Sequence, residues 1–114
     1  MIDFACRQFQ LEDVIKCAFQ LTKADCDVFK FLLKNPDWVT TESLTKKLKL
    51  NLSTVQRSVK KLHEKEAIQR TQTNLEGGGY IFLYKIKDKK AIRYILMQTI
   101  NGWVKHLEKE LNDW

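Results

Sequence analysis

The stretch Leu44–Leu62, LTKKLKLNLSTVQRSVKKL, decides the fold because its apolar residues divide into two helical sets. The residues that carry the pattern are Leu44, Leu48, Leu50, Val55, Val59 and Leu62. The first two lie four residues apart and the last three follow the i, i+4, i+7 spacing, so each set lines one face of its own helix. Leu50 fills the gap between the two helices. Two short helices joined by a turn of about three or four residues form a helix-turn-helix.

The second helix of this pair has a recognisable start and a recognisable exposed face. Asn51 is the expected N-cap because its side chain accepts a hydrogen bond from a free backbone N–H, and Ser53 with Gln56 is an alternative capping box. If the two valines point inward, a rotation of about 100° per residue defines the opposite face. That face consists of Ser53, Arg57, Lys60 and Glu64, flanked by Thr54, Gln56 and Lys61.

This exposed face is short, polar and basic, and its groups are those that bind DNA. Arg57 can donate two hydrogen bonds to O6 and N7 of guanine, and Gln56 can pair with adenine. Lys60 and Lys61 suit backbone phosphates. The sequence therefore predicts that this helix enters the major groove of double-stranded DNA.

The positive charge of the chain is concentrated around the same segment. The formal net charge is +6. Residues 40–70 hold eight Lys or Arg and three Asp or Glu, a net charge of +5, whereas residues 1–39 hold five basic and six acidic side chains. Such a concentration is typical of a surface that meets phosphates. A solvated, lysine-rich face that contacts nothing is the alternative.

Length and composition restrict the class of protein. The chain has 114 residues, enough for a single domain over residues 1–114, and 44% hydrophobic with 30% charged residues is typical of a globular fold. It contains no run of about 18 apolar residues and no secretory-signal pattern. We therefore expect no membrane partner and a cytoplasmic location.

Residues with catalytic or metal-binding chemistry are scattered. His63 and His106 fall on separate predicted helices without a matching Asp, Ser or Cys pattern, and the three cysteines follow no zinc-site spacing. The run Gly77–Gly79 lies between two predicted strands and not at a strand-to-helix turn, so it is no phosphate loop. We expect no catalytic residue, no metal and no cofactor, and so no enzyme.

The cysteines are expected to play different parts. Cys17 and Cys26 lie among apolar residues in helical patterns, and we expect both in the core of a protein kept in a reducing compartment. Cys6, near the N-terminus, is a candidate for a redox-reactive thiol, although no cationic cluster that would lower its pKa is visible in the sequence.

The segments around the helix pair predict two more helices and a hairpin. Amphipathic helices are expected over residues 10–20 and 22–34, the second starting with a capping box of Thr22 and Asp25. Residues 68–73 and 80–86 read as strands joined by a glycine-bearing loop. The predicted fold class is mainly α with a small β-hairpin, a winged helix-turn-helix with a long C-terminal dimerisation helix.

The last segment, residues 88–114, predicts one long amphipathic helix. Its apolar stripe consists of Ile92, Leu96, Ile100, Trp103, Leu107, Leu111 and Trp114. A stripe of this length on a small domain needs a partner, either the first helix or a second chain. We expect a dimer interface formed by the first six residues of this stripe, from Ile92 to Leu111.

Leu44–Leu62 resembles the helix-turn-helix of bacterial and archaeal regulators, including the tripeptide Ser53-Thr54-Val55 and the trailing VKKLHEKEAI at residues 59–68. The hairpin that ends in GGGYIFLYKI, residues 77–86, looks like the wing of the MarR and TrmB-like winged-helix groups. The long C-terminal helix resembles the dimerising helix of small archaeal members of these groups. The resemblance covers roughly residues 20–114.

The resemblance implies a homodimeric, sequence-specific transcriptional regulator, with a winged-helix core over residues 20–87 and a dimer interface from 1–19 and 88–114. The DNA contacts that it implies are Ser53, Thr54, Gln56, Arg57 and Lys60. Thr41 is a candidate phosphate contact because helix N-termini favour anions.

Three positions depart from the usual pattern of these groups. Lys49 stands where the turn between the two helices usually has Gly, so we expect a left-handed backbone there. Thr45 replaces the usual Ala of the first helix. The wing tip carries Glu76 and no Lys or Arg, and Arg70, lower on the wing, is the expected substitute for a basic tip.

Two alternatives stay open. A winged helix can be a protein–protein interaction module in a transcription-related complex, and the acidic wing tip and the apolar C-terminal helix suit that function. A small-molecule effector is a second partner to consider, in a cleft between the terminal helices of the dimer. The aromatic residues available to line it are Phe4, Phe9, Phe19, Trp103 and Trp114. The competing interpretation is that these aromatics form the core of the dimer.

Overall fold

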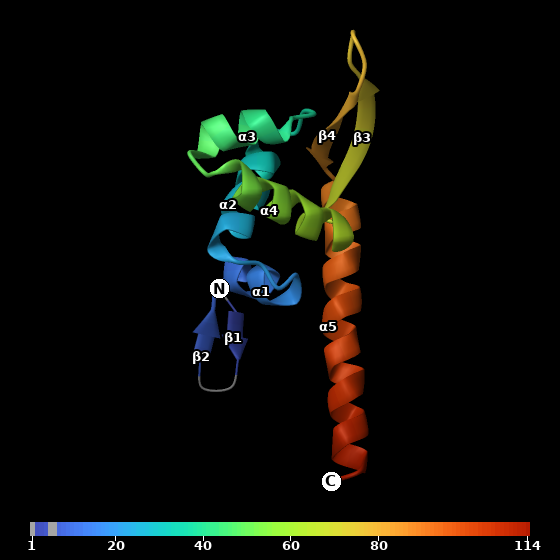
Figure 1. Ribbon diagram of the computed structural model, residues 1–114. Helices are drawn as coiled ribbons and strands as arrows, with labels where there is room; N and C mark the ends of the chain where they lie inside the picture. Colours follow the sequence, from blue (N-terminus) through green and yellow to red (C-terminus); the bar gives the residue numbers. More distant parts are fainter. Residues whose placement is uncertain (1, 5–6) are drawn as a thin grey trace.

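The computed structural model describes residues 2–4 and 7–114 and contains five helices and two antiparallel hairpins in that part of the chain. A short hairpin, β1 and β2, precedes helices α1 to α4; a longer hairpin, β3 and β4, follows, and α5 ends the chain (Figure 1). The bounds are β1 Ile2–Phe4, β2 Arg7–Phe9, α1 Leu11–Ala18, α2 Lys23–Lys34, α3 Thr41–Leu48, α4 Leu52–Glu64, β3 Ile68–Asn74, β4 Tyr80–Ile86 and α5 Lys89–Asn112.

The core lies where α2, α3, α4 and the base of the second hairpin meet. Val55, Val59 and Leu62 of α4 are buried there together with Leu32 of α2 and Leu44 of α3. Fully burying an aliphatic side chain stabilises a fold by about 1.5–3 kcal/mol, so these three positions fix which side of α4 faces inward. The helix-turn-helix predicted from Leu44–Leu62 is confirmed.

The turn between α3 and α4 has the backbone expected from its sequence. Asn51 is the N-cap of α4, and its side-chain oxygen accepts a hydrogen bond of 2.9 Å from the amide of Thr54. The alternative start at Ser53 is therefore not used. Lys49, the C-cap of α3, adopts a left-handed conformation with φ 56° and ψ 38°. A left-handed residue is the usual way to end a helix, but it is normally Gly.

The second hairpin forms the wing, and one residue outside it pairs with β4 as an isolated β-bridge. β3 and β4 pair antiparallel from Ile68 opposite Ile86 to Asn74 opposite Tyr80. Val39, in the connection from α2 to α3, pairs with Tyr84 of β4 through two backbone hydrogen bonds of 2.8 Å. The wing projects from one end of the molecule (Figure 1).

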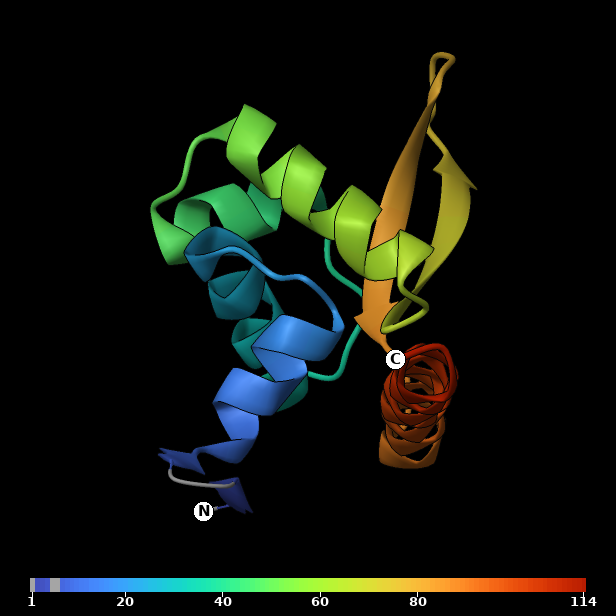
Figure 2. The same cartoon turned by 90° about the horizontal axis from the view of Figure 1, so that it is seen from below.

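Helix α5 is buried along its first half only. Ile92 lies in the core and is 6% exposed, and Ile95 and Leu96 pack against that core. From Asn101 onward every residue of α5 is exposed. The helix projects away from the body, which makes the molecule 62 Å long and about 25 Å wide (Figures 1 and 2).

The predicted dimer stripe is therefore wrong at one end. Ile92 was expected to face a partner, but it packs within its own chain because the start of α5 continues directly from β4 into the core. Leu96 and Ile100 are half-buried. Trp103, Leu107 and Leu111 are exposed, as a surface for a partner requires.

The predicted fold class is confirmed: a mainly helical, winged helix-like fold with a long C-terminal helix. The first helix, predicted over residues 10–20, is α1, and the strands β1 and β2, which the sequence did not predict, precede it. Cys17, expected in the core, is exposed, whereas Cys26 is buried. Cys6 lies outside the described residues. None of the helices within residues 2–4 and 7–114 has the length and apolar character needed to span a membrane.

The left-handed backbone at Lys49 generates a test of the turn. A non-glycine residue in this region costs about 1–2 kcal/mol, part of which Gly gives back through the entropy of the unfolded chain. We expect Lys49→Gly to raise the free energy of unfolding by up to about 1 kcal/mol in urea denaturation.

The matched control is Lys47→Gly, two residues earlier in the last turn of α3, which should lower the free energy of unfolding by up to about 1 kcal/mol. Two changes of the same sign would show that the turn does not store this backbone strain.

Candidate nucleic-acid interface

The exposed face of α4 carries most of the predicted DNA contacts. Ser53, Gln56, Arg57 and Lys60 are exposed, and Thr54 is half-buried, because Val55, Val59 and Leu62 occupy the inward face. The hydroxyl of Ser53 donates to the side-chain oxygen of the cap residue Asn51 at 3.0 Å. The predicted orientation of α4 is therefore the one found.

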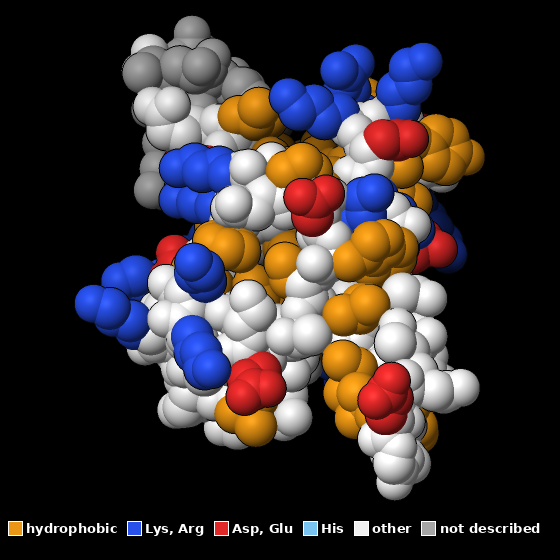
Figure 3. Space-filling model, turned by 90° about the horizontal axis from the view of Figure 1, so that it is seen from above, with side chains coloured by type: hydrophobic (Ala, Val, Ile, Leu, Met, Phe, Trp, Pro, Cys, Tyr) orange, Lys and Arg blue, Asp and Glu red, His pale blue; other side chains and the backbone are white. Residues whose placement is uncertain are grey.

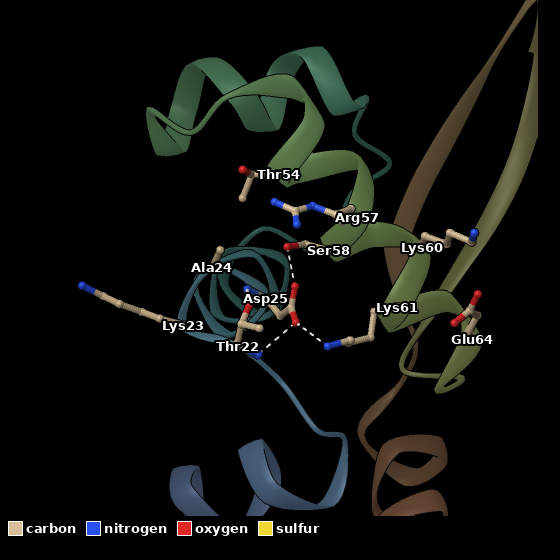
Figure 4. A pocket seen from close by; sticks show the side chains of 10 residues that line it. All are labelled: Thr22, Lys23, Ala24, Asp25, Thr54, Arg57, Ser58, Lys60, Lys61 and Glu64. Atoms are coloured by element: carbon tan, nitrogen blue, oxygen red, sulfur yellow. Dashed lines mark hydrogen bonds and ion pairs between the residues drawn. The ribbon is translucent and has the colours of Figure 1, made fainter.

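A buried carboxylate ties this helix to α2. Asp25 is only 4% exposed, and one of its oxygens accepts a hydrogen bond from the hydroxyl of Ser58 on α4. The other oxygen accepts from the amide of Thr22 at 2.9 Å and lies 3.2 Å from the ammonium of Lys61 (Figure 4). Asp25 thus caps its own helix and contacts α4 at two positions one turn apart.

The contacts of Asp25 stabilise its charged form. Burial by itself would raise the pKa of Asp25, but hydrogen bonds from Ser58 and Thr22 lower it. The ammonium of Lys61 lowers it further, so the pKa of this carboxyl lies below its ordinary value. The network is therefore ionised and fully hydrogen-bonded in the folded protein.

Lys61 is the predicted contact that the structure sets apart. Its ammonium pairs with Asp25 and also donates to the backbone carbonyl of Gln20 at 3.0 Å. The side chain is 35% exposed. Its charge is largely offset before any ligand arrives, whereas its neighbour Lys60 is exposed.

A cavity of about 580 Å³ lies between the start of α2 and the outer side of α4. Thr54, Arg57 and Lys60 line it from α4, and Lys23 from α2 (Figure 4). Lys23 lies at one edge and Lys60 at the other, with the guanidinium of Arg57 between them. Asp25 and Ser58 form its floor.

A second cavity, of about 260 Å³, lies on the other side of α4, toward the wing. It is lined by Thr41 at the start of α3, Gln56 of α4 and Phe82 of β4, among others. Thr40 is the N-cap of α3, and Thr41 is half-buried, with its carbonyl accepting a hydrogen bond from Thr45. The predicted DNA contacts therefore line both sides of α4. Thr54, Arg57 and Lys60 face the larger cavity, and Thr41 and Gln56 face the smaller one.

Arg70 lies apart from these cavities, on the wing. It is exposed, and its guanidinium carbon lies 4.3 Å from the centre of the Phe82 ring, a cation–π contact. Tyr80 packs edge-on against the same ring. The wing tip holds three glycines with positive φ and no basic residue. Any positive charge that the wing presents is therefore set back from its tip.

The surface seen from above carries Lys and Arg side chains along several of its edges, with apolar side chains exposed between them (Figure 3). Within the described residues no group of three or more His, Cys, Asp or Glu side chains is arranged to hold a metal ion.

The predicted aromatic cleft is not formed by a single chain. Phe19 is buried in the core, whereas Trp103 and Trp114 are exposed on and beyond the far half of α5. The side chains of Phe4 and Phe9 lie outside the described part of the structure.

Three residues of this interface escape an analysis of the sequence: Lys23, Asp25 and Ser58. Asp25 is recognisable only as a helix cap, because its partner Ser58 is 33 residues away. The one available signal is Ser58 itself, a polar residue directly before the buried Val59.

The chain matches one family model over residues 8–107, nearly its whole length, and that model describes the DnaD N-terminal domain. The chain belongs to the DnaD N-terminal domain family. The match does not confirm the more specific resemblance to the MarR and TrmB-like groups, which stays a prediction.

Known proteins resemble this DnaD N-terminal domain in both sequence and fold. A protein of Methanosarcina mazei Go1, named a possible transcriptional regulator, is 57% identical; the match covers 100% of this chain and 96% of that one, with a TM-score of 0.91. The ST1889 protein of the thermoacidophilic archaeon Sulfolobus tokodaii is 26% identical, with 84% and 93% coverage and a TM-score of 0.70. The uncharacterised protein MJ1503 of Methanocaldococcus jannaschii is 26% identical, with 91% and 78% coverage.

The Asp25 network generates a prediction for the pH dependence of stability. Because the folded-state pKa of Asp25 is lowered, its stabilisation is fully present above the unfolded-state value of about 3.9 and is lost as the pH falls through the folded-state value. We expect Asp25→Asn to lower the free energy of unfolding by about 1–3 kcal/mol at about pH 7. The difference in free energy of unfolding between the natural chain and this variant should become smaller below about pH 4.

Urea denaturation across this pH range measures the gap. Asp37→Asn, which removes one negative charge from an exposed site, is the control and should cost less than about 0.5 kcal/mol. A gap for Asp25→Asn that stays constant with pH would mean that its ionised form is not the stabilising one.

Proposed function

We propose that this chain is a sequence-specific, double-stranded DNA-binding transcriptional regulator that acts as a homodimer, with α4 in the major groove. The observation that carries the proposal is the orientation of α4. Its apolar face is buried, and a polar, basic face with Arg57 and Lys60 is left free on a helix about 20 Å long. The name of the Methanosarcina mazei relative, a possible transcriptional regulator, agrees with it.

The side chains on this face divide into two roles. Arg57 and Gln56 point from α4 with the donors and acceptors that distinguish guanine and adenine in the major groove. Ser53, Thr54 and Lys60 suit contacts that fix the helix on the backbone. Thr41 flanks the groove on the wing side, and Lys61 acts through its pairing with Asp25, which holds α4 in place.

The homodimer is supported by the far half of α5. Trp103, Leu107 and Leu111 lie on one face of this half and are 46–58% exposed, which is unusual for large apolar side chains in a contiguous stripe. Two such helices packed together would bury both stripes and hold two copies of α4 at a fixed separation. A palindromic site read in two successive major grooves requires that arrangement.

A protein-interaction module is the second candidate function, and the wing favours it. The wing tip carries Glu76 and no cation, and it exposes Leu75, Tyr80 and Ile81. Neither function involves a catalytic step or a cofactor. A cleft for a small-molecule effector would require the dimer, because Phe19 is buried in the core of its own chain whereas Trp103 and Trp114 are exposed at its other end.

The recognition helix is tested by the double substitution Arg57→Ala with Lys60→Ala. Both side chains are exposed, so the free energy of unfolding should change by less than about 0.5 kcal/mol. Affinity for a duplex selected from a random pool should fall by about tenfold or more, measured by fluorescence anisotropy.

The control Lys16→Ala with Lys34→Ala removes the same charge from exposed positions away from α4, and should leave the affinity within about twofold. Equal losses of affinity in the two double variants would mean that only the net charge of the chain matters for binding. An unchanged affinity of Arg57→Ala/Lys60→Ala would mean that α4 does not contact the DNA.

The dimer is tested on α5 by Leu107→Glu and by Trp103→Ala. Leu107 is 58% exposed, so a glutamate there is tolerated by the single chain but places a charge in an apolar interface. We expect light scattering to report a dimer for the natural chain and a monomer for both variants, with unchanged helix content. A natural chain that is already monomeric contradicts the homodimer.

A further inference from the structure

A helix in the major groove lies between two phosphate backbones, and α4 has a cavity on each side. The groove is about 12 Å wide, so a backbone runs along each flank of an inserted helix. On the wing side, the smaller cavity carries Thr41, an expected phosphate contact. On the other side lies the 580 Å³ cavity between α4 and α2. The sequence predicted no DNA contact on α2.

The free charge of this larger cavity is positive. Lys61 and Asp25 line it but are paired with each other. Of the remaining charged side chains, Lys23, Arg57 and Lys60 are basic and Glu64 is acidic, and all four are exposed. The close-up view shows the guanidinium of Arg57 over the space between α4 and α2, while Lys23 and Lys60 extend outward from its two edges (Figure 4).

Lys23 occupies a position that a cation does not favour. It is the first residue of α2, where the partial positive charge of the helix end repels an ammonium group. Its side chain is exposed and makes no ion pair within the described residues. Local stability therefore gives no reason for a lysine here, and positions that break a local rule in this way are common at binding sites.

We propose that the cavity between α2 and α4 holds a backbone phosphate of the bound DNA, and that Lys23 is a phosphate contact. This inference rests on the proposed function. Arg57 and Lys60 approach the groove from α4, while Lys23 reaches the flanking strand from α2, so the interface extends beyond the helix-turn-helix. Lys61 offsets the charge of Asp25 and Ser58 donates a hydrogen bond to it, so a phosphate can enter without meeting an unpaired carboxylate on the cavity floor.

The test uses the full chain and a mixed-sequence duplex of about 24 base pairs, titrated between about 50 and 200 mM salt. A phosphate contact carries no sequence information, so Lys23→Ala should weaken binding equally for selected and mixed duplexes. It should also reduce the slope of log K against log salt by about 0.9. Lys23→Glu should weaken binding more than Lys23→Ala.

Lys34→Ala is the matched control, because Lys34 is exposed on the same helix about 16 Å from Lys23. Its affinity and salt slope should equal those of the natural chain. Neither lysine is expected to matter for folding. A urea unfolding curve of each variant, compared with that of the natural chain, checks this.

Three outcomes overturn the inference, and they are distinguishable. A Lys23→Ala slope equal to that of the natural chain, with Arg57→Ala/Lys60→Ala still weakened, removes only the phosphate contact. Failure of the natural chain to bind either duplex overturns the proposed function as well. If inorganic phosphate raises the melting temperature of the natural chain but not of Lys23→Ala, while the slope is unchanged, the cavity takes a free anion and not DNA.

Discussion

The structure depends on the burial of a single face of α4. Val55, Val59 and Leu62 are at most 1% exposed, and they belong to the core that α4 forms with α2, α3 and the base of the wing. Once these three side chains are inside, the helix has no rotational freedom left. The outward positions of Arg57 and Lys60 then follow from helix geometry alone.

The buried Asp25 adds what apolar packing lacks: it fixes the position of α4 along α2. Apolar side chains can exchange neighbours along a helix at modest cost, but a carboxylate removed from water must keep its donors. Asp25 finds them on Thr22 of its own helix and on Ser58 and Lys61 of α4. The same carboxylate thus caps the start of α2 and sets the position of α4 along it, so a shift of either helix would leave an unpaired charge.

Much of the fold and of the exposed face of α4 could be predicted because both rest on local periodicity and capping. Asn51, Lys49 and the three inward residues of α4 each carry a signal within a few positions. The β1–β2 hairpin could not be predicted because strands of three residues are too short to show alternation. The pairing of Asp25 with Ser58, the exposure of Cys17 and the burial of Ile92 depend on contacts between distant segments, which no local pattern encodes.

The tip of the wing has a consequence for which amino acids can stand there. Gly77, Gly78 and Gly79 all have positive φ, and an added Cβ at any of them would meet no atom within 4 Å. The restriction is therefore one of handedness and not of space: a mirror-image residue would fit where a natural one is strained. Substitution by any other natural residue at these three positions is therefore disfavoured, and the side chains that the loop presents come from Leu75 and Glu76.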